Sequence, residues 1–175
     1  MIRFCCFLFF LCFAQEEPKI VWKENHHLKW DDFKAKPQNR GSAVATTASG
    51  ITFGFSIKER NGQVEDFTTQ VQAHFYPDHS WYKIEQATPH ILGHEQLHFD
   101  ITELYARKFK QRIKELKPSR NIKRQLEQLH SAIQKELAMM QDQYDAETNF
   151  SRHKEAQHKW QFFINSELEK LSGLE

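Results

Sequence analysis

The sequence predicts an α+β fold, with a small antiparallel sheet in its N-terminal half packed on a long helix that two further helices follow. Apolar and polar residues alternate with a period of two on both sides of a turn signal at residues 61–62. Downstream, apolar residues recur every three or four positions in three segments, which Pro118 and residues 144–150 separate. Strands followed by helices indicate an α+β architecture.

The sheet is expected to contain a hairpin over residues 51–76. Apolar side chains occupy alternate positions over residues 51–57 and 67–75, and Asn61-Gly62 between them is a strong signal for a tight turn. Residues 42–49 could pair with this hairpin as a third strand. A short extended segment is expected around residues 28–33.

The helical half begins at Thr88-Pro89. Threonine is a good N-cap, and proline at the first helical position loses no hydrogen bond. This helix is expected to run to about Leu116, before Pro118. A second helix is expected over residues 122–140, then a loop around residues 144–150, and then a third helix over residues 156–171.

The first of these helices carries the sequence His94-Glu95-Gln96-Leu97-His98, an H-E-x-x-H motif. Two imidazoles one helical turn apart can share one Zn²⁺, and the glutamate can take a proton from a water that the metal activates. A sheet packed on such a helix is the arrangement of zincin peptidases. The motif therefore predicts a zincin-like zinc hydrolase, and a peptidase in particular.

The position of the motif on its helix supports a metal site. Both histidines fall on the apolar stripe, where a single histidine would most simply be a core residue, but the pair with its glutamate favours metal. Asp100 and Glu103 lie on the opposite face and are expected to be solvated or paired with Lys or Arg. His90 lies about 12 Å along the axis from His98, so we expect it to support the site or the fold.

The first fourteen residues are expected to be a signal peptide, leaving residues 15–175 as one metallopeptidase domain that is secreted or periplasmic. Arg3 precedes an apolar run, and Cys12-Phe13-Ala14 offers a small-x-small cleavage site. A retained N-terminal anchor is the alternative, and bulky Leu11 argues against a lipoprotein site at Cys12. All three cysteines lie in this segment. Histidine and carboxylate therefore remain as zinc ligands, which suits a catalytic site.

The balance of basic and acidic residues limits the kinds of binding partner that we expect. The chain has 24 basic and 23 acidic residues, so removal of Arg3 leaves 23 of each. This balance gives no case for nucleic acid or an anionic membrane as a partner, and no stable membrane insertion of the mature chain is expected. The expected partner is a peptide or protein substrate, and no sequence feature indicates an oligomeric state.

Three blocks of the sequence resemble the DUF922 family, small secreted bacterial proteins predicted to be zinc-dependent proteases. They are residues 28–33 (LKWDDF), residues 92–101 (LGHEQLHFDI) and Tyr144-Asp145-x-x-Thr148. The resemblance implies a zincin-like fold and peptidase activity. Many members continue the last block as Y-D-x-x-T-x-H-G, whereas this chain has Phe150 and Ser151 at the final two positions.

The third zinc ligand is expected to be Asp145, which belongs to the part of the late motif that this chain retains. A carboxylate is a common third ligand, and catalytic zinc takes three protein ligands and leaves one position for water. Alternatively, Asp145 caps the third helix or orients a histidine ring. His153, in the first turn of the third helix, and Glu147 are the other candidates for the ligand.

These residues predict a secreted zinc metallopeptidase in which Glu95 is the general base and returns its proton to the leaving amine. Tyr144 could help to stabilise the oxyanion, although packing at a helix end explains it more simply. An alternative is a non-catalytic zinc-binding or envelope interaction protein on a degenerate zincin scaffold, because Phe150 replaces the family's histidine. A third reading treats His94 and His98 as core residues of a structural domain.

Overall fold

The hairpin that the sequence predicts dominates the N-terminal half of the computed structural model, which describes residues 17–38 and 42–174. Strands β3 (Ser49–Arg60) and β4 (Gln63–Phe75) pair antiparallel and are joined at Asn61-Gly62. Both turn residues have positive φ, 51° and 75°, as a two-residue hairpin turn requires. The predicted signal peptide lies outside the described residues.

The prediction that residues 42–49 form the third strand of the main sheet is wrong. The third strand of the main sheet is β1 (Ile20–Val21), beside β4, whereas β2 (Ala45–Thr46) pairs with β5 (Trp81–Tyr82) in a separate two-stranded sheet. Residues 42–48 lead directly into β3, so they cannot fold back on it without a turn, and they meet the chain that follows β4 instead.

The predicted extended segment around residues 28–33 contains a 3₁₀ turn at Trp30–Asp32. The carboxylate of Asp32 accepts a hydrogen bond of 2.7 Å from the backbone N–H of Lys29, and this bond closes the turn. Local side-chain hydrogen bonding of this kind competes with extended structure.

Three helices form the second half: α1 (Pro89–Lys114), α2 (Ile122–Thr148) and α3 (Lys154–Lys170). The predicted N-cap of α1 is confirmed, because the Thr88 hydroxyl accepts a hydrogen bond of 3.2 Å from the backbone N–H of Ile91. Within the part of the chain that the structure describes, none of the helices has the length and apolar character needed to cross a bilayer.

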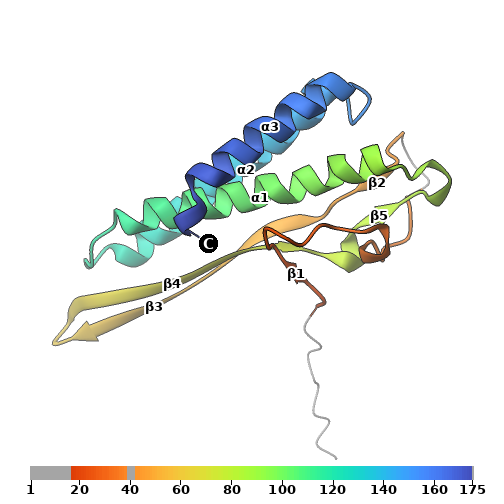
Figure 1. Ribbon diagram of the computed structural model, residues 1–175. Helices are drawn as coiled ribbons and strands as arrows, with labels where there is room; N and C mark the ends of the chain where they lie inside the picture. The colour runs from red at the N-terminus through yellow and green to blue at the C-terminus, as the bar shows by residue number, and fades with distance from the viewer. Residues whose placement is uncertain (1–16, 39–41, 175) are drawn as a thin grey trace, which may run out of the picture.

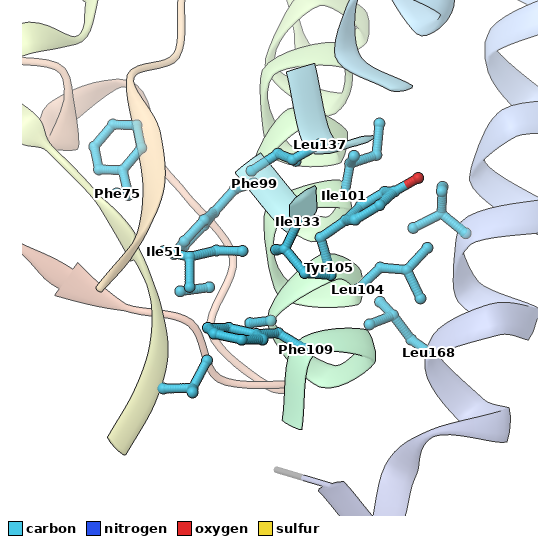
Figure 2. Close-up of a cluster of buried hydrophobic side chains, with 14 of the residues drawn as sticks. Ile51, Phe75, Phe99, Ile101, Leu104, Tyr105, Phe109, Ile133, Leu137 and Leu168 are labelled. Atoms are coloured by element: carbon cyan, nitrogen blue, oxygen red, sulfur yellow. The ribbon is translucent and has the colours of Figure 1, made fainter. Parts of the chain in front are cut away.

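Helix α1 lies between the sheet and α3, and α2 packs along it (Figure 1). On the sheet side, the rings of Phe75 and Phe99 lie 5.9 Å apart, with Ile51 beside them (Figure 2). Leu104 of α1 and Leu168 of α3 are buried on the other side. Each such side chain contributes about 1.5–3 kcal/mol when it leaves water. The chain therefore has an α+β fold with a small antiparallel sheet and three helices.

Much of the polar face of α1 is buried and not solvated, because other elements cover both sides of the helix. Glu103 and Arg107 form an ion pair of 2.8 Å, as the sequence allows, yet both are buried rather than solvated. The Arg107 guanidinium also donates to the backbone carbonyl of Leu168 at 2.9 Å and lies 5.1 Å from the ring of Trp22. Asp100 accepts a hydrogen bond of 2.8 Å from the Trp22 indole. Helix α3 and the N-terminal segment thus cover this face.

The predicted loop around residues 144–150 is mostly helical. Helix α2 continues to Thr148 because Tyr144 and Thr148, one turn apart, are both buried against the rest of the fold. The Thr148 hydroxyl donates to the backbone carbonyl of Tyr144 at 2.7 Å. The helix ends at Asn149, whose φ is 47°, and the turn to α3 is correspondingly short.

Candidate metal centre

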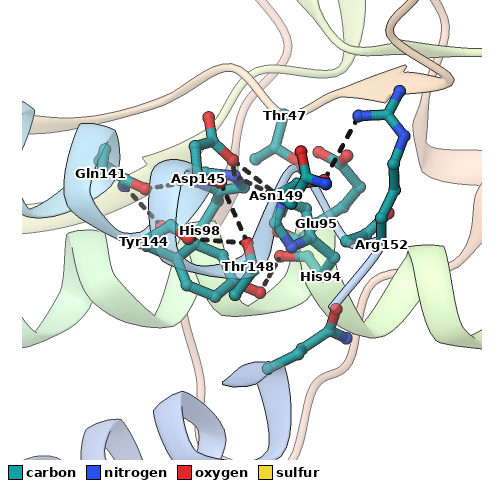
Figure 3. Close-up of polar contacts among 12 residues, drawn as sticks. Thr47, His94, Glu95, His98, Gln141, Tyr144, Asp145, Thr148, Asn149 and Arg152 are labelled. Atoms are coloured by element: carbon teal, nitrogen blue, oxygen red, sulfur yellow. Dashed lines mark hydrogen bonds and ion pairs between the residues drawn. The ribbon is translucent and has the colours of Figure 1, made fainter. Parts of the chain in front are cut away.

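Helix α1 presents His94 and His98 on one face, and their Nε2 atoms lie 3.2 Å apart. The spacing of four residues places one ring above the other by one helical turn. Both rings point toward the end of α2 (Figure 3). The side chains are almost fully enclosed, with 5% of His94 and 14% of His98 exposed.

Asp145 completes a triangle with these two atoms. Its Oδ1 atom lies 3.0 Å from Nε2 of His94 and 3.1 Å from Nε2 of His98. Asp145 is on the last turn of α2 rather than in the predicted loop, and the packing of α2 on α1 brings it to the histidines. The structure therefore brings together His94, His98 and Asp145, the three residues predicted to be zinc ligands.

The triangle has dimensions that fit Zn²⁺. Three ligand atoms at about 2.0–2.1 Å from a tetrahedral ion lie about 3.3 Å from one another. The separations here are 3.0, 3.1 and 3.2 Å, so nearly equal sides surround one point. Hydrogen bonds among these three side chains would give similar distances. The residues around the triangle therefore also bear on whether it binds a metal.

Gln141 orients the ring of His98. Its side-chain oxygen contacts Nδ1 of His98, and its side-chain nitrogen donates to the backbone carbonyl of His98 at 2.9 Å. An acceptor at Nδ1 favours a proton there, so that Nε2 can direct a lone pair into the triangle once its own proton is lost. Gln141 was not among the site residues predicted from the sequence, although it lies one helical turn before Asp145.

Tyr144 lies behind the two imidazoles. Its ring stacks on His94 at a centroid distance of 4.5 Å and meets His98 nearly edge-on at 5.0 Å. Its hydroxyl donates to the backbone carbonyl of His94 at 3.4 Å, and the side chain is fully buried. Burial and the nearby charge of Glu95 raise the pKa of the Tyr144 hydroxyl well above its usual range. The structure thus favours the packing role of Tyr144 over contact with a substrate.

Within the triangle, His98 and Asp145 shift each other's pKa toward the charged forms. Burial alone would raise the pKa of Asp145, but the hydrogen bonds from His94 and His98 outweigh it and hold that pKa well below its usual range. Burial would lower the pKa of His98, yet the hydrogen bond to Asp145 and the charge of Glu95 raise it overall. The site is therefore built to hold positive charge between the two rings and the carboxylate.

Glu95 lies beside the triangle with an unsatisfied carboxylate. It is 5% exposed, and its Oε2 atom is buried without a hydrogen-bond partner among the described residues. The Nδ1 atom of His94 is also buried without a hydrogen-bond partner among the described residues. A buried, unpaired carboxylate oxygen is costly, and such an atom calls for an explanation such as an ion, a water or a catalytic role.

A groove of about 990 Å³ gives access to these groups. Its floor contains Glu95 and the three residues of the triangle. One wall is segment 42–47, which contains β2. A hydrogen bond of 3.2 Å from the Thr47 hydroxyl to the backbone carbonyl of Glu95 holds it against α1. The start of α1 and the α2–α3 turn form the rest of the wall.

The other candidate ligands lie elsewhere. Glu147 accepts hydrogen bonds of 2.8 Å from Trp160 and from Gln143, and it lines a different cavity between α2 and α3 together with His153. His153 occupies the N-cap position of α3. His90 is bound to the backbone carbonyl of Ser151 at 2.7 Å. Of the three candidates for the third ligand, only Asp145 faces the histidines.

Comparison with protein families identifies a relationship over most of the chain. The profile of "Bacterial protein of unknown function (DUF922)" matches residues 26–154, which include both histidines and Asp145. The chain belongs to the DUF922 family. The family's description assigns no activity, and searches of curated proteins and of solved structures returned no match. Any function of this DUF922 protein must therefore be argued from its groove.

Proposed function

We propose that this DUF922 protein is an exported, zinc-dependent peptidase with a zincin-like arrangement of helix and sheet. The observation that carries the proposal is the triangle of two imidazole nitrogens and one carboxylate oxygen, with sides of 3.0–3.2 Å, at the floor of an open groove. Two His and one carboxylate form a common ligand set of catalytic zinc sites.

Zn²⁺ in this triangle would acidify a water molecule and polarise a peptide carbonyl. His94 and His98 would bind it through Nε2, and Asp145 would bind it through Oδ1. Tyr144 and Gln141 hold the two rings in place, so little side-chain freedom would be lost on binding. The histidine protons must leave first, so affinity should fall at acidic pH.

Glu95 has the position of a general base. Its carboxylate lies in the same groove as the triangle and one of its oxygens is unpaired, so it can accept a proton from a water beside the ion. The water oxygen would add to the peptide carbonyl carbon first, and the C–N bond would break when the amine nitrogen is protonated. Glu95 would supply that proton to the leaving amine.

The shape of the groove suits an extended peptide. Segment 42–47 runs along one wall. Its strand β2 pairs with β5 along one edge, and an extended peptide would add along the other edge. A polypeptide substrate outside the cytoplasm would agree with the export signal expected at residues 1–14.

The test combines metal content with turnover. The purified mature chain should hold one zinc per molecule, and His94→Ala should lose it. Glu95→Gln should retain zinc and abolish cleavage of a denatured-protein digest, because it removes only the base. Hydrolysis that is unchanged in Glu95→Gln, or zinc that is fully retained in His94→Ala, would refute the proposal.

A non-catalytic zinc protein remains the second candidate because of Phe150. Where many family members carry histidine, this side chain is 59% exposed and lines the groove beside the triangle. An exposed apolar side chain at this position favours binding of a partner protein over catalysis. Bound zinc together with a complete lack of cleavage would support this candidate over the peptidase.

A further inference from the structure

We propose that the groove selects peptides that carry a carboxylate, and that Arg152 and Lys154 bind this group. The inference deepens the proposed function, because it names the substrate class of the same site. It starts from the charges that line the groove. Apart from Glu95 and Asp145 at its floor, the charged side chains of this lining are Arg152 and Lys154.

Neither cation is neutralised by a carboxylate in the part of the chain that the structure describes. Both side chains are exposed, and neither lies within ion-pair distance of a carboxylate in residues 17–38 or 42–174. Among the described residues, the guanidinium of Arg152 donates one hydrogen bond, of 3.3 Å, to the backbone carbonyl of Asn149. Since arginine has five N–H donors in a planar fork, donors remain for a ligand carboxylate.

The floor of the groove does not compensate these charges once metal is present. A divalent ion carries two positive charges, and Glu95 and Asp145 supply one negative charge each, so the floor becomes formally neutral. Arg152 and Lys154 then leave the groove with a formal charge of +2. A low-dielectric groove focuses such a field on a bound ligand.

The turn that carries Arg152 is held in a strained shape. Asn149, Phe150 and Ser151 have φ of 47°, 52° and 69°, three consecutive left-handed residues without a glycine. A residue other than glycine adopts this conformation at an energetic cost, and the conformation persists only where its surroundings fix it.

Contacts from two helices fix the turn. The ring of His90, at the start of α1, contacts the backbone carbonyl of Ser151 at 2.7 Å, and the backbone N–H of His153 donates to the carbonyl of Thr148 at 2.8 Å. The turn therefore presents its side chains from a defined position. Figure 3 shows the Arg152 guanidinium on the side of the site where Glu95 lies.

The ligand carboxylate has two sources, an Asp or Glu side chain or the C-terminus of the peptide. A pair of cations binds either one in the same way. The sources differ in where cleavage would occur, because a bound C-terminus would make the enzyme a carboxypeptidase. The experiment therefore blocks each source separately.

The experiment measures retention of peptide pools on immobilised, zinc-loaded Glu95→Gln protein, which keeps the groove but lacks the base. Four N-acetylated random decapeptide pools are used, with Asp and Glu or with Asn and Gln in their place, each with a free or an amidated C-terminus. We expect pools with a carboxylate to be retained roughly tenfold more than the pool that has none, and this ratio to fall as salt rises. The pool that is enriched identifies the source.

A matched charge reversal tests the residues. Arg152→Glu with Lys154→Glu should abolish the preference, whereas Lys117→Glu with Arg120→Glu should preserve it. The control pair is also exposed, lies in the α1–α2 connection at the far end of the helices, and changes the net charge equally. Circular dichroism establishes that both double variants are folded.

Equal retention of all four pools, no retention of any pool, or a preference that survives Arg152→Glu with Lys154→Glu would overturn the inference. The proposed peptidase activity is tested separately by incubating each of the four pools with zinc-loaded wild-type protein. Retention without products would refute the peptidase and leave the selection standing. Products formed equally from all four pools would support the peptidase and refute the selection of carboxylates.

Discussion

Gln141 contacts His98 at both ends of the histidine, with its side-chain oxygen at the ring Nδ1 and its side-chain nitrogen on the backbone carbonyl at 2.9 Å. One amide from α2 thereby fixes the ring of a residue on α1. The same amide nitrogen lies 3.3 Å from the Thr102 hydroxyl, which extends the link by one more turn of α1. The direction of Nε2 thus depends on how α2 packs against α1.

Replacement of Gln141 by leucine should weaken zinc binding without removing a ligand. Loss of the partner of Nδ1 frees the His98 ring to rotate, and such outer contacts contribute about 10–100-fold to metal affinity. The measurement is a competitive titration against a chelating dye. Gln143→Leu is the control because Gln143 is exposed and bonds only to Glu147 among the described residues. Equal affinity in wild type and Gln141→Leu would contradict this role.

Asp145→Asn should lower zinc affinity by about a hundredfold or more, since a ligand contributes at least as much as a residue that supports one. The amide keeps the size of the side chain but lacks the negative charge. Asp142→Asn removes a charge from the exposed side of the same helix and should leave affinity unchanged. If the Asp145 and Asp142 variants bound zinc equally well, the third ligand would have to be another group.

The buried pair Glu103–Arg107 should show strong coupling in unfolding. Arg107→Leu alone leaves the Glu103 charge buried and should lower the free energy of unfolding by about 3–5 kcal/mol. Adding Glu103→Leu should recover part of this loss, because the buried charge is then gone. Urea unfolding followed by tryptophan fluorescence measures both. Lys123→Ala, in an exposed pair at 3.9 Å, should change the free energy by less than about 1 kcal/mol.

His74 should make the metal-free protein less stable at mildly acid pH. Burial, together with the charge of Lys19, lowers its pKa from the usual 6.5, and its Nδ1 lies 3.0 Å from the Thr52 hydroxyl. The unfolded chain therefore binds this proton more readily than the folded one. Its contribution to stability is complete above pH 6.5 and is lost as the pH falls from 6.5 toward the lowered pKa.

The measurement for His74 is the free energy of unfolding against pH with a chelator present, for wild type and His74→Gln. The variant has no titrating ring at this position, so the two curves should converge as the pH falls through that window. Parallel curves between pH 5 and pH 7 would show that His74 titrates alike in both states.

Local patterns were sufficient to predict the hairpin, the start of α1, and the group of His94, Glu95 and His98. Alternation and a two-residue turn fix the pairing of adjacent strands, and helical geometry fixes residues one turn apart. The extent of α2 was mispredicted because residues 141–148 are mostly polar. The spacing of Leu137, Tyr144 and Thr148, all buried, was the available signal.

Local sequence patterns could not predict which distant segments of the chain contact one another. The place of Asp145 depends on where α2 ends and how it packs, over a separation of 47 residues from His98. Burial of the polar face of α1 depends on α3 and on Trp22, which are 61 and 78 residues from their hydrogen-bond partners on α1. Sequence periodicity carries no information about such pairings.

The ligands of the triangle come from two helices that are joined by a long stretch of chain. Zinc held there would close a loop of about 50 residues, as a covalent bridge between the same positions would, and would restrict the unfolded chain by a comparable loop entropy. Since every cysteine precedes residue 13, no disulfide is available to the rest of the chain. A metal cross-link would stabilise this end of the helices in oxidising and reducing surroundings alike.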